Sequence, residues 1–100
     1  MTGLAALADP TRQRIVEMLA SGPLSSGEIA RRFKVSAPAI SQHLKTLREA
    51  KMVRVRAEAQ RRIYELDPDG VNEISEWIER IRAFWTAKLD ALETQLEEQA

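Results

Sequence analysis

The stretch that decides the fold is SSGEIARRFKVSAPAISQHLKTL, residues 25–47, which contains two helix starts close together. Ser25 and Glu28 have the spacing of a capping box, in which hydroxyl and carboxylate each bond an otherwise unpaired backbone amide. Ser36 is a favoured N-cap for a second helix. We therefore predict a short helix extending through Phe33, a tight turn, and a second helix that runs to about Ala50.

The second helix has two different faces. With about 100° between successive residues, Ile40, Leu44 and Leu47 fall on one side and should pack into the core. The opposite side, near the N-terminal end, carries short polar groups and one cation: Pro38, Ser41, Gln42 and Lys45. His43, the only histidine, lies beside the core stripe, so we predict that it is packed or hydrogen-bonded rather than a ligand.

Two Asp-Pro pairs mark further helix starts. Asp is a favoured N-cap, and Pro is tolerated at the first helical position. Asp9-Pro10 therefore begins a helix after a short Ala/Leu-rich helical segment at residues 4–8, and Ser21-Gly22-Pro23 ends it. Asp67-Pro68 begins the last helix by the same chemistry.

From Met52 the apolar period changes to two. Val53 and Val55 alternate with arginines, and Tyr64 and Leu66 continue an alternating pattern after a turn. Two alternating runs with a short connection predict a β-hairpin. The connecting residues 57–60 contain none of the Gly or Asn that tight hairpin turns prefer, so we expect a longer loop there.

The last helix carries one apolar stripe at spacings of three and four residues. Its members are Val71, Ile74, Ile78, Ile81, Trp85, Leu89, Leu92 and Leu96, and Trp77 and Phe84 widen the face. Such a stripe at the edge of a small domain needs a partner. We predict that one side packs on the domain and the other on a second subunit. The alternative is a helix that packs wholly within its own chain.

Charge divides the chain into two halves. Residues 12–62 hold 12 Lys/Arg against 4 Asp/Glu, whereas residues 63–100 hold 3 against 10. The basic half has the sign needed to meet phosphate, although two solvated faces of opposite sign are the alternative. The chain has no cysteine, no apolar run of membrane-spanning length and no visible signal peptide, so we expect a cytoplasmic protein.

Helix, turn, helix and then a basic hairpin is the order of a winged helix-turn-helix. This order predicts a mainly α fold with a small β-hairpin, in which the second helix enters the major groove of DNA. We predict a single domain over residues 1–100. Residues 1–66 would form the helical core, the recognition helix and the wing, and residues 67–98 a dimerisation helix.

The predicted DNA contacts come from the recognition helix and the hairpin. Gln can pair with adenine, Ser donates or accepts, and Lys prefers guanine or phosphate, while wing arginines can hold phosphate or enter the minor groove. The hairpin arginines could also form a charged edge that deters strand pairing. The predicted set is Ser36, Ala37, Pro38, Ser41, Gln42, Lys45, Arg54, Arg56, Arg61 and Arg62.

These residues resemble the ArsR/SmtB family of bacterial repressors. The resemblance covers most of residues 4–66 and is carried by LADPTR at 7–12, Ile29-Ala30, SQHLKTLR at 41–48 and RIY at 62–64. It implies a winged-helix homodimer that binds an imperfect palindrome through two recognition helices. The first and last helices would form the dimer interface, here through Leu4, Leu7, Ile78, Ile81, Trp85, Leu89, Leu92 and Leu96.

The chain departs from the family pattern in two ways. Metal-sensing members use cysteines in the first helix of the pair, or Asp and His on the last helix. This chain has no cysteine and no histidine after His43, so we expect no metal and no cofactor. The resemblance is therefore to a cysteine-free, autorepressor-like subgroup. In addition, Lys51 and Ala59 stand where the family commonly has glycine.

We therefore predict a homodimeric, sequence-specific repressor that binds a palindromic operator in double-stranded DNA. Two alternatives stay open. One is a protein-interaction module that uses the last helix without reading DNA. The other is a ligand-responsive repressor with an inducer pocket near Trp77, Phe84 and Trp85. We do not expect an enzyme, because the sequence offers no nucleophile–base pair, no Gly-rich phosphate loop and no convergent carboxylates.

Overall fold

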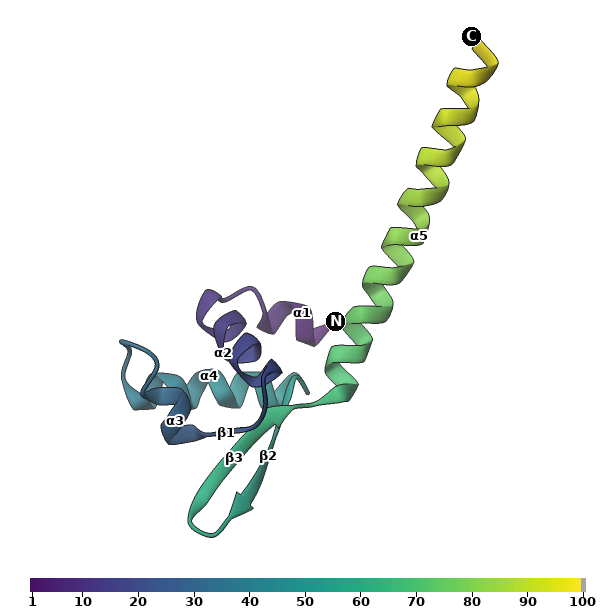
Figure 1. Cartoon of the computed structure of the whole chain (residues 1–100). Helices are drawn as coiled ribbons and strands as arrows, with labels where there is room; N and C mark the ends of the chain where they lie inside the picture. The colour runs from purple at the N-terminus through teal and green to yellow at the C-terminus, as the bar shows by residue number, and fades with distance from the viewer. Residues whose placement is uncertain (100) are drawn as a thin grey trace.

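The computed structural model describes residues 1–99, and Figure 1 shows their arrangement. In chain order the elements are α1 (Thr2–Ala6), α2 (Pro10–Ala20), β1 (Leu24–Ser25), α3 (Ser26–Ala30), α4 (Ala37–Glu49), β2 (Val53–Glu58), β3 (Arg61–Leu66) and α5 (Pro68–Gln99). The elements before α5, here called the body, pack together, and α5 projects away from them. The molecule therefore measures 68 × 25 × 22 Å. A mainly α winged helix-turn-helix with a long last helix, as predicted, is confirmed.

The predicted N-caps all start helices. The Asp9 carboxylate accepts hydrogen bonds from two first-turn amides of α2, the shorter at 2.7 Å. Ser25 and Glu28 form both bonds of the capping box of α3. The Ser36 hydroxyl accepts a hydrogen bond from the amide of Ala39 at 3.3 Å. These caps fix where α2, α3 and α4 begin, because each satisfies a backbone donor that has no partner within its helix.

The helix α3 is shorter than predicted. It ends at Ala30 rather than extending through Phe33, because the amides of Arg32 and Phe33 bond to carbonyls three residues back, as in a turn. Phe33 still packs against the core, and the guanidinium of Arg14 lies 4.5 Å from the centre of its ring. The apolar spacing was therefore a correct guide to burial but a wrong guide to the helix end.

The sheet has three antiparallel strands in the order β1-β3-β2. The strand β1, which was not predicted, pairs Leu24 with Tyr64 and Ser25 with Ile63. The prediction of a long hairpin loop was wrong, because Glu58 pairs with Arg61 and leaves a two-residue turn. Ala59 begins this turn with φ 57°, the conformation that both favoured hairpin turns require at that position and that usually selects glycine or asparagine.

The core lies among the helices and one face of the sheet. Its fully buried large side chains come from α2, α3, α4 and the start of β2: Ile15, Ile29, Ile40, Leu44, Leu47, Met52 and Val53. All three residues of the predicted core stripe of α4 are among them. The body therefore encloses an apolar core of its own, which fixes the direction in which the other face of α4 points.

The start of α5 is held against the end of α4. The amide of Met52 donates to the carbonyl of Leu47, and the amide of Asp67 donates to the carbonyl of Met52, both at 2.9 Å. A Cβ atom on Gly70 would lie 2.2 Å from the carbonyl oxygen of Lys51, so only glycine permits this approach. Lys51 itself has φ 59°, a left-handed conformation that suits glycine best.

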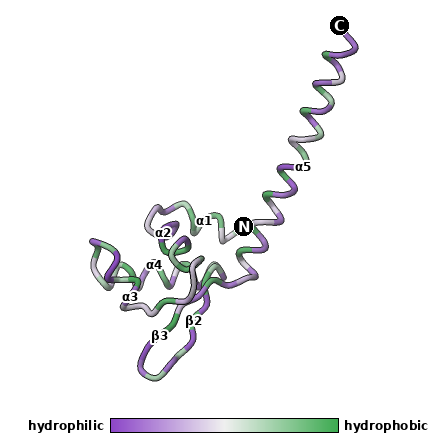
Figure 2. Tube along the Cα trace, viewed as in Figure 1, coloured by the Kyte–Doolittle hydropathy of each residue, from purple (hydrophilic) through white to green (hydrophobic). Residues whose placement is uncertain are grey.

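Beyond its first two turns, α5 leaves the body. Val71 and Ile74 pack against the core, but the large apolar side chains that follow are exposed, from 37% for Trp77 to 60% for Leu96. Figure 2 shows apolar and polar residues alternating along the projecting helix. The chain alone does not cover the apolar stripe, so the alternative of wholly internal packing is wrong. Within residues 1–99, no helix is long and apolar enough to cross a membrane.

Candidate nucleic-acid interface

The exposed face of α4 borders a groove. The groove has a volume of about 520 Å³ and lies between α4, the start of α3 and the inner side of the wing. It contains four of the residues predicted to contact DNA on α4, Pro38, Ser41, Gln42 and Lys45, all of them exposed. Ser36 and Ala37, at the beginning of the helix, are exposed as well. Donors, acceptors and one cation are thus presented together on a single face, as the reading of base edges requires.

Three further residues of the groove were not predicted. Arg48 extends the exposed stripe of α4 by one turn, and Ser26 and Tyr64 border it from α3 and β3. The signal for Arg48 was available, because it follows Lys45 by three residues and Ser41 by seven, on the same helix face. The placement of Ser26 depends on how α3 packs against β3, which the helix pattern alone does not reveal.

The two faces of the wing differ. Opposite residues of an antiparallel pair share a face, so the register places Val55 with Tyr64 and Ala57 with Arg62 on the side of the core and the groove. Arg54, Arg56 and Arg61 project from the other side, because they alternate with these residues. The four predicted wing arginines therefore do not act as one set.

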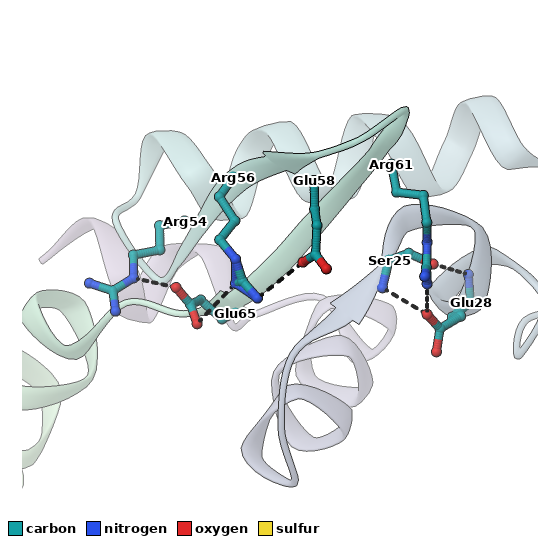
Figure 3. Close-up of polar contacts among 7 residues, drawn as sticks. All are labelled: Ser25, Glu28, Arg54, Arg56, Glu58, Arg61 and Glu65. Atoms are coloured by element: carbon teal, nitrogen blue, oxygen red, sulfur yellow. Dashed lines mark hydrogen bonds and ion pairs between the residues drawn. The ribbon is translucent and has the colours of Figure 1, made fainter.

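The three arginines on the outer face form ion pairs. Arg54 bonds to Glu65 at 2.9 Å, Arg56 lies 3.5 Å from Glu58 and 3.9 Å from Glu65, and Arg61 contacts Glu28 of α3. Figure 3 shows this row of alternating charges along the wing. Exposed pairs of this kind contribute little to stability. They do reduce the positive charge that the outer face offers to phosphate.

Arg62 is the exception among the wing arginines. Its side chain lines the groove beside α4, and within the described residues 1–99 it takes part in none of the ion pairs. A guanidinium in this position keeps its full charge and its donors for an anion. Of the predicted wing residues, Arg62 is therefore the one that the fold brings together with the exposed face of α4.

His43 is half-buried and hydrogen-bonded, as predicted. Its Nδ1 lies 3.2 Å from a terminal guanidinium nitrogen of Arg12, whose Nε donates to the carbonyl of Ala6 at 2.6 Å. Because arginine can only donate, Nδ1 is the acceptor in this contact. Arg12 thus joins the end of α1 to α4. Among residues 1–99, no three Asp, Glu or His side chains gather closely enough to hold a metal ion.

Two carboxylates that cap helices have a lowered pKa. The backbone amide of Arg12, and after it that of Thr11, hold the pKa of Asp9 below the ordinary 3.8. Hydrogen bonds from the hydroxyl and amide of Ser25, with a further contribution from the charge of Arg61, hold the pKa of Glu28 below 4.5. Both groups are therefore ionised at neutral pH.

The residues predicted for a dimer interface fall into two groups. Leu4 and Leu7 are half-buried in the body, whereas Ile78, Ile81, Trp85, Leu89, Leu92 and Leu96 are exposed along α5. Phe84 and Trp85 meet edge to face, with ring centres 6.4 Å apart. The aromatic cluster lies on the projecting part of α5, so this chain alone does not enclose it, and an inducer pocket there would need a second chain.

Known proteins share this arrangement. A family model described as a helix-turn-helix domain matches residues 7–56. The chain is 51% identical to an HTH-type transcriptional regulator of Mycobacterium tuberculosis, over 84% of this chain and 76% of the relative. It is 33% identical to the transcriptional repressor SdpR of Bacillus subtilis, over 73% and 81% respectively. It also resembles the structure of an ArsR-like transcriptional regulator from Rhodococcus, with a TM-score of 0.77, 30% identity, and coverage of 93% and 88%.

The fold, the exposed recognition helix and these relatives define a helix-turn-helix transcriptional regulator that binds DNA and is not an enzyme. More narrowly, the chain belongs to the ArsR family, and because it has no cysteine it falls in the part of that family without thiolate metal sites.

Proposed function

We propose that this protein is a homodimeric repressor that binds a palindromic operator, with α4 of each subunit in the major groove. The observation that carries the proposal is the exposed polar stripe of α4, which lines the same groove as Arg62, a residue outside the ion pairs found among residues 1–99. In this proposal Gln42 and Ser41 contact base edges, Lys45 and Arg48 contact guanine or phosphate, and Arg62 contacts phosphate. Repression is supported by the name of the B. subtilis relative.

The homodimer is supported by the uncovered stripe of α5. Seven large apolar side chains from Ile78 to Leu96 are each at least 40% exposed, which is costly in water unless a partner covers them. A second copy supplies the same stripe, and a two-fold axis would set two recognition helices about 34 Å apart, one turn of DNA. In this proposal residues 1–100 form one functional unit, and α5 is its dimerisation element.

Sequence-specific DNA binding can be tested by fluorescence anisotropy with duplexes taken from the DNA upstream of the gene that encodes this protein. We expect specific binding that weakens steeply with salt. Gln42→Ala should lower the preference for the operator over random DNA by about 5- to 150-fold for each half-site, the range for one two-point base contact. Arg62→Ala should weaken both DNAs alike. Arg80→Ala is the matched control, because Arg80 is exposed on the projecting part of α5, outside the predicted DNA contacts.

If wild-type protein shows no salt-dependent binding to any duplex, DNA reading is excluded. Light scattering coupled to size exclusion then decides between the remaining functions. A monomer that becomes dimeric only with a different protein would favour an interaction module. A stable homodimer that binds operator and random DNA equally would contradict the sequence-reading role given to α4.

A further inference from the structure

A second hollow adjoins the recognition groove. It has a volume of about 490 Å³ and lies between the beginning of α3 and the turn end of the wing. Its lining includes three arginines and two polar side chains: Ser26, Arg31, Gln60, Arg61 and Arg62. Ser26 and Arg62 line the recognition groove as well, so the two hollows are neighbours on the surface. A duplex held in the groove would therefore extend over this hollow.

The charge of the hollow is only partly balanced. Arg61 is bound by the carboxylate of Glu28, as Figure 3 shows. Arg31 and Arg62 take part in none of the ion pairs among residues 1–99. Arginines from the end of α3 and from β3 line the same hollow, and each guanidinium is a planar set of donors that matches the oxygens of a phosphate. The hollow is thus suited to a single anion with several oxygen acceptors.

We infer that this hollow, here called the phosphate pocket, binds one backbone phosphate of duplex DNA, and that Glu28 weakens this binding by neutralising Arg61. The inference rests on the proposed function, because the duplex must lie in the adjacent groove. A backbone phosphate is favoured over a free anion because the pocket shares Ser26 and Arg62 with that groove. Phosphate contacts position a protein on DNA without reading its sequence.

Glu28 is suited to this role because its position is fixed independently of DNA. One of its carboxylate oxygens accepts a hydrogen bond from the amide of Ser25 at 3.3 Å as well as the bond from Arg61. The pairing of Arg61 is therefore built into the start of α3. By reducing sequence-independent attraction, Glu28 raises the share of the binding free energy that comes from base contacts. This makes Glu28 a specificity-determining residue that touches no base.

The test measures how binding to random-sequence duplex depends on salt, between about 50 and 200 mM, by anisotropy. Each phosphate contact contributes about 0.9 to the slope of log K against log salt. We expect Arg31→Ala to reduce the slope by about 0.9 per protomer, or about 1.8 for a dimer, and Arg31→Lys to restore most of it. Arg80→Ala, an equal change of charge at an exposed residue on the projecting part of α5, outside the predicted DNA contacts, should leave the slope unchanged.

The variant Glu28→Gln gives the opposite expectation. Gln preserves the capping box but removes the charge that neutralises Arg61, so the slope should steepen and random DNA should bind more tightly. Circular dichroism and thermal unfolding establish that each variant is folded. If Arg31→Ala has the same slope as the wild type, the pocket does not bind a backbone phosphate. If Glu28→Gln leaves the slope unchanged, Glu28 does not weaken that binding. Absence of salt-dependent binding by the wild type would overturn both, and the proposed function with them.

Discussion

The body and the projecting part of α5 both have helices with an apolar stripe, but only the body covers its stripes with its own side chains. Leu44 in the body is 1% exposed, whereas Leu92 on α5 is 53% exposed. Both lie on regular helices with apolar residues at spacings of three and four. The difference teaches that periodicity identifies the face of a helix that will be covered, but not which molecule covers it. The body covers its own apolar faces, whereas the apolar face of the projecting part of α5 stays exposed.

The largest expected effect comes from the same substitution made in both regions. Leu44→Ala should lower the free energy of unfolding by about 2–5 kcal/mol, because it removes buried methyl groups and leaves a cavity. Leu92→Ala should have an effect that depends on protein concentration, since it acts only through association. Urea unfolding at two protein concentrations measures both. A large, concentration-independent loss for Leu92→Ala would mean that α5 packs within its own chain.

A charge in the apolar stripe should separate the two regions further. Leu89→Glu places a carboxylate in the proposed dimer interface and should weaken dimerisation by at least about 30-fold, the effect of losing one strong interface residue. The monomer should then lose helical order in residues 84–99, because a long helix without tertiary contacts is only marginally stable in water. Hydrogen exchange should show fast amides there and slow amides in α4. Slow exchange in both regions of a monomer would contradict the claim that residues 84–99 need a second subunit to stay helical.

Acid should lower the free energy of unfolding of the body, which contains two helix-capping carboxylates, whereas the apolar stripe of α5 has no charge to titrate. Asp9 and Glu28 have lower pKa values when folded than their ordinary 3.8 and 4.5, so the unfolded chain binds more protons at low pH. Their contribution is fully present above about pH 4.5 and is lost as pH falls through the folded pKa values. Urea midpoints should decline below that pH. Asp9→Asn should make the decline shallower, and an identical decline would remove Asp9 as a cause.

The smallest effect is expected at the wing turn. Ala59 has φ 57°, which costs a residue with a Cβ about 1–2 kcal/mol, whereas glycine adopts it freely. After allowing for the greater flexibility of glycine in the unfolded chain, Ala59→Gly should stabilise the body by about 0.5–1 kcal/mol. Thermal unfolding measures this gain. Gln60→Gly is the control, because Gln60 lacks the positive φ, and it should bring no gain.

Much of the fold was predictable because it depends on local chemistry. Asp9, Ser25 and Ser36 satisfy backbone donors within three residues, so their sequence positions alone locate the beginnings of α2, α3 and α4. The core stripe of α4 follows from helix geometry. The strand β1 was missed because it contains two residues and exists only through pairing with β3, far along the chain.

The candidate site was predictable in part for the same reason. The exposed face of α4 follows from the buried one, so Ser41, Gln42 and Lys45 were found from spacing. The roles of the wing arginines depend on the turn length, since the register decides which of them share a face. A two-residue turn at Ala59 separates Arg62 from the other three. The pairing of Arg61 with Glu28 joins residues 33 positions apart, which no local pattern encodes.

The close approach of Gly70 to the carbonyl of Lys51 also limits how far α5 can tilt relative to α4. It brings the first turn of α5 directly against the residue that follows the C-cap of α4, although the whole wing lies between them in the chain, and so restricts the relative direction of the two helices. In a two-fold dimer each recognition helix would lie about 17 Å from the symmetry axis, half of one DNA turn. Over that radius a tilt of about 10° displaces the helix by about 3 Å, close to the rise of one base pair. In the proposed dimer, the absence of a side chain at Gly70 would therefore determine whether the two half-sites are read in register.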